Sequence, residues 1–102
     1  MKRHFVRPSA IEAEITTIPG MKNAIIHERA ALRAARLVRE MRNAANLSQS
    51  KLAKELQVSQ VRVSQIENGK GRYGVSVELL ERVADACGGT LEFRFAKAAQ
   101  LG

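Results

Sequence analysis

Polar side chains that suit a DNA groove are concentrated between Ser59 and Asn68. Within this run, Val63 and Ile66 recur at i, i+3 and predict the apolar face of a short helix. The opposite face carries the remaining side chains, Gln60, Val61, Arg62, Ser64 and Gln65. Amide, guanidinium and hydroxyl groups are those with which proteins hydrogen-bond base edges and phosphates. The chemistry that this pattern predicts is therefore recognition of duplex DNA.

Another short helix is predicted directly before this one, and the two must position each other. Ser48 is suited to cap its N-terminus, and Leu52, Ala53 and Leu56 form its apolar stripe. Ser59 is suited to cap the helix that follows. Ala53 provides the small side chain that two steeply crossing helices need between them. The pair therefore predicts a helix-turn-helix motif with the polar face on its second helix.

The segment from Leu47 to Asn68, LSQSKLAKELQVSQVRVSQIEN, resembles the helix-turn-helix of the Cro/cI-type (XRE) regulators. The run 67–70, ENGK, is similar to the family's sequence after the recognition helix. Arg42 stands at the first-helix position that pairs with Glu67 in the family, which implies a partly buried, structural ion pair. The chain departs from the family at Gln57, because the turn usually holds a glycine and a left-handed residue with a Cβ costs about 1 kcal/mol.

The resemblance also implies roles for the polar residues of the motif. Gln49 is expected to bind a phosphate at the positive end of its helix. Gln60 is expected to make a bidentate contact with adenine, Val61 to meet a thymine methyl, and Arg62 to reach a guanine or a phosphate. The further positions expected at the DNA are Ser59, Ser64, Gln65, Asn68, Lys70 and Arg72.

Composition agrees with a nucleic-acid partner. The 102 residues suffice for one small domain with tails, and the formal net charge is +7. Between residues 29 and 72, ten Lys or Arg stand against three Glu, so the positive charge belongs to the region of the motif and not to a tail. The single cysteine, Cys87, excludes an intramolecular disulfide, fits a reducing cytoplasm and is expected to be a buried structural thiol. No apolar run approaches the about 20 residues that span a membrane.

The motif is expected to lie within a domain of residues 28–88. A long first helix is predicted from about Ile26 to Asn46, with an inward face of Leu32, Ala35, Val38, Met41 and Ala45. Its outward face carries Arg29, Arg33, Arg36 and Arg39. A last helix is predicted from about Val77 to Cys87, capped by Ser76 and ended by the glycines at 88 and 89. Its inward residues are expected to be Leu79, Leu80, Val83 and Ala84.

Residues 1–27 form an N-terminal extension in this division of the chain. Ile11, Ile15 and Ile18 recur at i, i+4, i+7 between two proline-containing breaks. This spacing predicts a short amphipathic helix, although the β-branched residues at 15–18 also fit an extended strand. No other predicted element of the domain is expected to cover these isoleucines. They therefore suggest a protein-binding segment, and this segment is the candidate site for a toxin.

Residues 89–102 form the C-terminal part. Leu91, Phe93 and Phe95 alternate with charged residues, which predicts a β-strand. A lone strand has unpaired edges, so we expect it to pair with its copy across the two-fold axis of a homodimer. The alternative is pairing within the chain, with residues 4–6 or 16–18. The expected fold is mainly α, an XRE-type bundle of four to five helices with a C-terminal strand that pairs across a dimer.

No arrangement of residues predicts catalysis. His4 and His27 are far apart in the sequence, no spacing of His, Cys or carboxylates suggests a metal site, and no Ser/His/Asp set can be argued. The glycine-rich run at 69–74 lacks the P-loop pattern. We therefore expect neither an enzyme nor a cofactor.

Two uses of the same DNA-binding domain remain open. The region LLERVADACGGTLEFRF resembles the C-terminal halves of HigA- and HipB-like antitoxins. That resemblance implies a repressor of double-stranded operator DNA in the bacterial cytoplasm, associated with the nucleoid when bound, that also neutralises a protein toxin. The alternative is a stand-alone phage- or plasmid-type regulator without a toxin partner.

Overall fold

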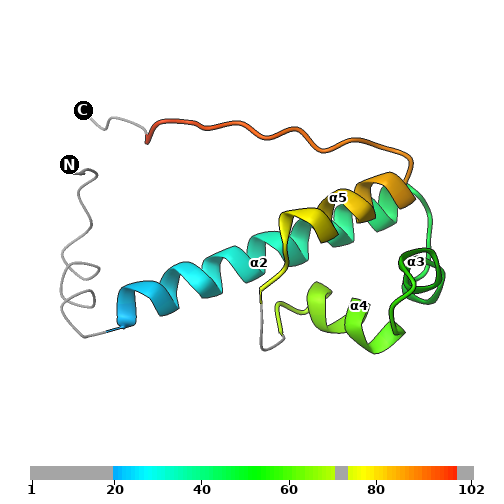
Figure 1. Ribbon diagram of the computed structural model, residues 1–102, viewed down its shortest axis with the longest axis horizontal. Helices are drawn as coiled ribbons and strands as arrows, with labels where there is room; N and C mark the ends of the chain where they lie inside the picture. Colours follow the sequence, from blue (N-terminus) through cyan, green and yellow to red (C-terminus); the bar gives the residue numbers. More distant parts are fainter. Residues whose placement is uncertain (1–19, 71–73, 99–102) are drawn as a thin grey trace.

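The computed structural model describes residues 20–70 and 74–98, and in these ranges it contains four helices and no strand. The helices are α2 (Met21–Ala44), α3 (Gln49–Leu56), α4 (Gln60–Glu67) and α5 (Val77–Ala86). Figure 1 shows α2 as a long rod, with α5 lying along it and with α3 and α4 near its C-terminal half. The predicted mainly α bundle is confirmed in these ranges.

Three of the helices begin in the same way, with a serine cap. Ser48, Ser59 and Ser76 have extended backbone angles, and each hydroxyl accepts a hydrogen bond of 3.0 Å from the amide three residues later. Each bond satisfies an amide that has no partner inside the helix. The three caps predicted from the sequence are confirmed.

The helices end in a common way as well. Each is followed by a residue with positive φ, namely Asn46, Gln57, Gly69 and Gly88. The amide after that residue then donates back to a carbonyl of the last turn, as in the 2.8 Å bond from Gly89 N to Ala84 O. This is the hydrogen-bond pattern of the Schellman motif. Gln57 adopts φ 60° and ψ 43°, so the left-handed conformation expected at this departure from the family pattern is present.

The core lies where α3, α4 and α5 meet the C-terminal half of α2. Its buried cluster is formed by Val38, Leu52, Ala53, Leu56, Val63, Ile66 and Val83. Every apolar position predicted to face inward on α3 and α4 is in this cluster. On α5, Val83 and Ala84 are buried, while Leu79 and Leu80 are half-buried. The periodicity of the sequence therefore identified the core-facing sides of the three short helices.

The first helix differs from its prediction at its N-terminal end. α2 begins at Met21 and not at about Ile26, so the first helix extends into residues of the predicted N-terminal extension. Leu32 was predicted to face inward and is instead 54% exposed. The physical reason is length: α3, α4 and α5 are short and cover only the C-terminal half of α2, where Ala35 and Val38 are buried. The N-terminal half of α2 projects beyond them (Figure 1).

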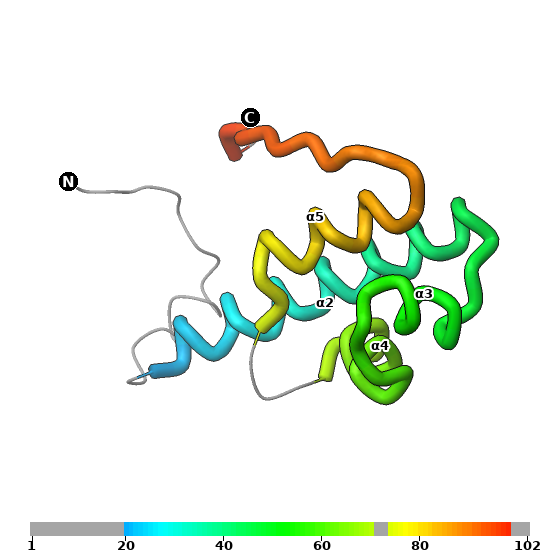
Figure 2. Tube along the Cα trace, turned by 45° about the vertical axis from the view of Figure 1, so that its right-hand side comes forward, coloured from blue at the N-terminus to red at the C-terminus, as the bar shows by residue number. Residues whose placement is uncertain are grey.

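The predicted C-terminal strand is absent from the described residues. Residues 89–98 leave α5 and double back on the side of α5 away from α4, without regular structure (Figures 1 and 2). Phe93 is 61% exposed and Phe95 90% exposed, whereas Leu91 is half-buried. A strand requires a neighbouring strand for its amides and carbonyls, and no described segment of the chain provides one.

Several expectations fall outside the described residues. These are the helix or strand around Ile11, Ile15 and Ile18, the intrachain pairing partners at 4–6 and 16–18, and the position of Arg72. Within residues 20–70 and 74–98, no helix combines the length and the apolar character that crossing a membrane requires.

Candidate nucleic-acid interface

The turn between α3 and α4 brings the two helices of the motif together at a steep angle. Gln57 provides the left-handed residue, and the amide of Val58 donates to the carbonyl of Ala53 over 3.0 Å. Ala53 is buried at this junction, in agreement with the small side chain expected there. Arg82 of α5 also reaches the end of α3, where its Nη2 donates to the carbonyl of Leu56 over 2.5 Å. The end of α3, from which the turn leads to α4, is thus tied to α5.

The solvent face of α4 carries the side chains predicted to contact DNA. Gln60, Val61 and Gln65 are exposed, and Arg62 and Ser64 are half-buried. Val63 and Ile66 on the other face are buried in the core. Because the apolar anchors fix the rotation of the helix, the polar side chains form one continuous outward surface. Such a helix is the element that a helix-turn-helix protein places in the major groove.

Arg42 and Glu67 connect the first helix to the end of α4. Arg42 Nε lies 2.6 Å and Nη2 lies 2.9 Å from the two carboxylate oxygens of Glu67, a bidentate arrangement. The third guanidinium nitrogen, Nη1, donates to the carbonyl of Leu47 over 2.9 Å. The Glu67 side chain is 2% exposed and that of Arg42 is 16% exposed. The structure therefore contains the ion pair that the family resemblance implied, and the pair is nearly removed from water.

The pKa values of this pair reflect the balance between burial and pairing. Burial alone would raise the pKa of the Glu67 carboxyl, but the hydrogen bonds from Arg42 and Gln49 and the positive charges of Arg42 and Arg39 outweigh it. The pKa of Glu67 therefore lies below its usual value. The hydrogen bond to Glu67 raises the pKa of Arg42 above its ordinary value, against the opposing effect of partial burial. Both groups are charged at neutral pH.

Gln49 has a contact that sequence reasoning did not foresee. Its Nε2 donates to Glu67 Oε1 over 3.1 Å, so the side chain that we expected at a phosphate lies against the buried carboxylate. One amide proton is committed to this bond, while the other proton and the amide oxygen have no such partner in the part of the chain that the structure describes. The side chain joins the N-terminus of α3 to the C-terminus of α4.

The residues that follow α4 are only partly free to contact DNA. Asn68 donates its side-chain amide to the carbonyl of Ser64 over 2.8 Å and lies 3.4 Å from the Ser64 hydroxyl. Lys70 is exposed, and its backbone amide is held by the carbonyl of Gln65 over 2.8 Å. The structure thus keeps the Lys70 ammonium at the surface beside the end of the recognition helix.

Arg39 of α2 makes a contact at the end of α4 that the sequence did not indicate. Its Nη2 donates to the backbone carbonyl of Glu67 over 2.6 Å, and the side chain remains 53% exposed. The signal that could have identified it is its position one turn before Arg42, which places both guanidinium groups near the end of α4. Arg39 therefore satisfies a terminal carbonyl of the recognition helix and keeps a positive charge beside it.

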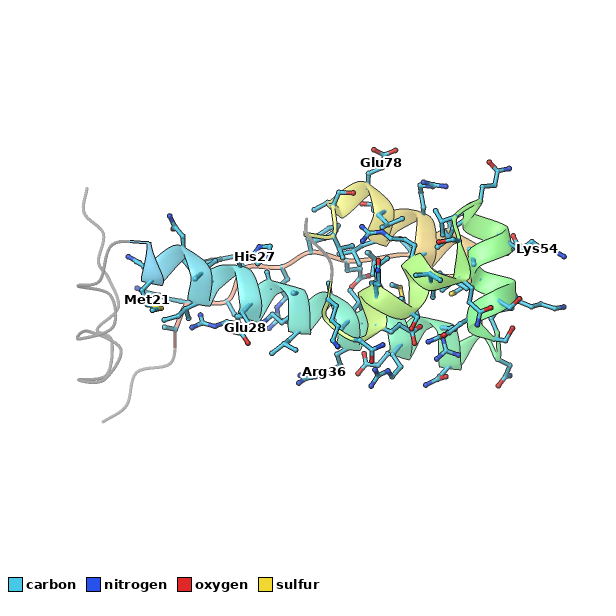
Figure 3. The ribbon with its side chains drawn as sticks, turned by 90° about the horizontal axis from the view of Figure 1, so that it is seen from below. Met21, His27, Glu28, Arg36, Lys54 and Glu78 are labelled. Carbon is cyan, nitrogen blue, oxygen red and sulfur yellow. The ribbon has the colours of Figure 1, made fainter. Side chains whose placement is uncertain are left out.

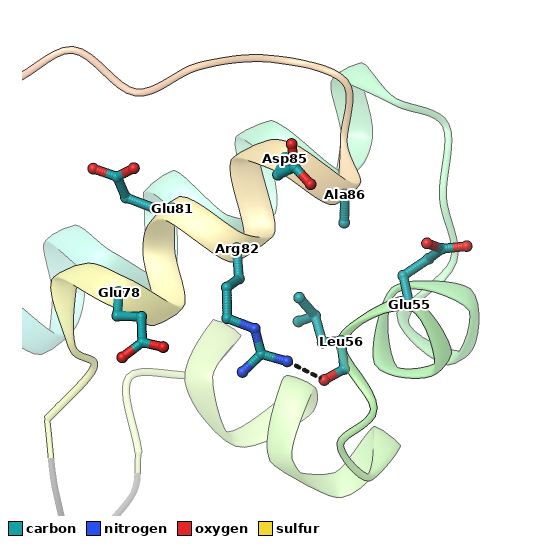
Figure 4. Close-up of a pocket in the computed structure, with 7 residues that line it drawn as sticks. All are labelled: Glu55, Leu56, Glu78, Glu81, Arg82, Asp85 and Ala86. Carbon is teal, nitrogen blue, oxygen red and sulfur yellow. Dashed lines mark hydrogen bonds between the residues drawn. The ribbon is translucent and has the colours of Figure 1, made fainter.

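The surface between α3 and α5 has the opposite charge. An open depression of about 450 Å³ is lined by Glu55, Leu56, Glu78, Glu81, Arg82, Asp85 and Ala86. Figure 4 shows that the guanidinium group of Arg82 extends to the carbonyl of Leu56, and that the lining also carries four carboxylates from two helices. The negative charge of this depression repels phosphate groups. A surface that attracts DNA must therefore lie elsewhere on the molecule. Among the described residues, no group of His, Cys, Asp and Glu could hold a metal ion.

Comparison with known proteins yields one match. Residues 38–93 match a family model described as helix-turn-helix, which spans more than half of the chain and includes α3, α4 and α5. No curated protein matches the chain, and no solved structure matches it.

Proposed function

Because this chain belongs to the XRE-type helix-turn-helix family of DNA-binding regulators, we propose that it is a sequence-specific transcriptional repressor of double-stranded operator DNA. The observation that carries this proposal is the outward face of α4, where Gln60 and Gln65 are exposed and Arg62 is half-buried. The buried Arg42–Glu67 pair supports it, because it holds α4 against the body of the domain.

We propose that the repressor acts as a homodimer. Two recognition helices related by a two-fold axis reach adjacent major grooves about 34 Å apart, which requires a palindromic operator. The C-terminal segment supports this arrangement, because Phe93 and Phe95 are exposed and residues 91–95 alternate in the manner of a strand. Pairing of this segment with its copy would satisfy both backbones and cover the phenylalanines.

The base contacts are tested by substitutions on α4. We would select operator sequences from a random duplex pool and measure affinity for Gln60→Ala and Arg62→Ala by fluorescence anisotropy at fixed salt. A bidentate contact contributes about 1–3 kcal/mol to base discrimination. Each substitution should therefore weaken operator binding by about 5- to 150-fold and lower the affinity for random DNA much less. Glu81→Ala on the exposed side of α5 is the control. Unchanged operator affinity in both α4 variants, with folding intact, would show that α4 is not the recognition element.

We further propose that the protein is the antitoxin of a type II toxin–antitoxin module and represses its own operon. Exposed apolar side chains outside the motif support a protein partner, since Ile26 and Leu32 on α2 are each at least half exposed. The isoleucines at 11, 15 and 18, which lie outside the described residues, are proposed to bind the toxin. The similarity of the C-terminal region to HigA- and HipB-like antitoxins is the second support.

Co-expression with the neighbouring open reading frame tests this role. A tagged chain should co-purify with a small polypeptide at fixed stoichiometry, and that polypeptide should arrest growth when it is expressed alone. A chain lacking residues 1–19 should lose the partner and still bind operator DNA. Absence of any partner, with operator binding preserved, would favour the stand-alone regulator.

A further inference from the structure

The part of α2 that precedes residue 38, where the family match begins, is a second basic surface of the molecule. α2 begins 17 residues before the part of the chain that matches the helix-turn-helix family, a length of about 25 Å of helix. The first turns of α2 project beyond the other helices (Figure 1), and the whole of this part has no assigned role in the motif. Over its whole length α2 carries six basic residues against two acidic ones, Glu28 and Glu40.

This surface is continuous with the end of the recognition helix. Arg39 bonds the carbonyl of Glu67, and one helical turn earlier Arg36 lies on the adjoining face of α2. Leu32 passes close to Gly69, where an added Cβ would lie 3.2 Å from Leu32 Cδ2. Because Lys70 follows Gly69, α2 runs directly past the turn whose lysine is expected at the DNA backbone. The two basic regions are thus joined without an intervening element.

Arg33 and Arg36 are the charges available on this surface. Both are exposed, and neither has a hydrogen-bond or ion-pair partner among the described residues. Figure 3 looks at the molecule from the side on which α4 lies, and there Arg36 projects from α2 to the side opposite Glu78 of α5. An exposed arginine without an acidic partner is suited to a phosphate group, which its planar guanidinium can hold through two hydrogen bonds.

We propose that the part of α2 before residue 38 is a second DNA-contacting element, which binds phosphates outside the bases that α4 contacts, through Arg33 and Arg36. This inference rests on the proposed DNA-binding function and adds to it a longer site. The contacts are to the backbone, so they add affinity and salt dependence and carry no base preference. The partner is duplex DNA, because the surface continues the one that α4 presents to a major groove.

The test compares Arg33→Gln/Arg36→Gln with a control that removes the same charge elsewhere, Lys54→Gln/Lys97→Gln. Lys54 lies at the far end of the molecule from Met21 (Figure 3), and Lys97 lies on the C-terminal segment. The probe is a 30-base-pair duplex of random sequence, together with the same duplex carrying the selected operator. Affinity is measured over a series of salt concentrations.

Each phosphate contact contributes about 0.9 to the slope of log affinity against log salt. The α2 double variant should therefore lower the slope by about 2 per bound protomer, on operator and random DNA alike. On the operator duplex, the hydroxyl-radical footprint should also shorten at its edges. Arg33→Lys/Arg36→Lys should recover most of the slope, because it keeps the charge. An unchanged slope, or an equal loss in the control, would overturn the proposal.

The outcome is separable from failure of the proposed function. If wild-type protein binds the operator and loses that preference on Gln60→Ala, the function stands whatever the α2 variant does. If wild-type protein does not bind duplex DNA at all, both proposals are overturned. If the α2 variant retains DNA binding but loses a co-purified protein, the surface serves a protein partner and the phosphate assignment is wrong.

Discussion

The substitution Arg42→Ala should destabilise the fold by several kcal/mol. It removes the bidentate contact to Glu67 and the hydrogen bond to the Leu47 carbonyl, and it leaves a carboxylate that is 2% exposed. Gln49 alone would then remain as a side-chain hydrogen-bond donor to that carboxylate. Breaking a buried pair in this way costs about 3–5 kcal/mol, because the remaining carboxylate, away from water, keeps only the amide of Gln49 and the exposed guanidinium of Arg39 at 3.9 Å.

The assay is thermal and urea unfolding followed by circular dichroism. For a domain of this size, each kcal/mol corresponds to about 4–8 °C, so Tm should fall by at least about 12 °C. The deficit should shrink at low pH, because protonation of Glu67 removes the buried charge that has lost its bidentate partner. Arg39→Ala is the matched control, since it also removes contacts to Glu67: a hydrogen bond to the backbone carbonyl and a long ion pair of 3.9 Å with the carboxylate, both made by a side chain that is 53% exposed. We expect it to cost about 1 kcal/mol or less.

A double substitution completes the test. Replacing both partners, Arg42→Met/Glu67→Leu, removes the charge that the single variant leaves buried, so its cost should be well below the sum of the two single costs. The reasoning would be refuted if Arg42→Ala cost less than about 1 kcal/mol, or if the double variant cost as much as the sum. A loss of DNA binding by Arg42→Ala at a temperature where it is unfolded would report stability and not a lost contact.

Three further outcomes are expected. The pKa of Glu67 is lower in the folded protein than its ordinary value of 4.5. The ionised carboxylate therefore contributes its full stabilisation above pH 4.5, and this contribution should be lost as the pH falls through the lower pKa of the folded state. Measuring Tm over an acid titration would detect the loss. Gln57→Gly should stabilise the domain by about 0.5–1 kcal/mol, because the position has φ 60° and glycine avoids the strain of a Cβ there; a lowered urea midpoint would contradict this. Ser59→Ala should lower the free energy of unfolding by about 1 kcal/mol, because it removes the hydrogen bond to the Arg62 amide, whereas Ser59→Asp should be nearly neutral. An equal loss of stability in the two variants, measured by thermal unfolding, would rule out the cap.

The local features of the motif could be predicted because their causes lie within a few residues of each other. A serine hydroxyl caps the amide three residues later, and apolar residues at i, i+3 and i+4 share one side of a helix whatever surrounds it. The caps at Ser48, Ser59 and Ser76 and the buried faces of α3 and α4 follow from these short-range rules. The Arg42–Glu67 pair joins residues 25 apart, and only the family resemblance indicated it beforehand.

The remaining features depend on what lies opposite each element. Leu32 fits the inward stripe of α2 by spacing, yet it is exposed because no helix extends far enough to cover it. Residues 91–95 alternate like a strand, yet no described strand lies beside them to accept their hydrogen bonds. Gln49 lies at a helix N-terminus suited to a phosphate, and only the packing of α3 against α4 brings its amide to Glu67. Where the helices of the motif begin and which sides they bury can be predicted from the sequence, since both are set by residues that are near neighbours along the chain. Which side chains stay exposed and available to a partner depends on the tertiary structure, because a side chain is buried only where another element packs over it.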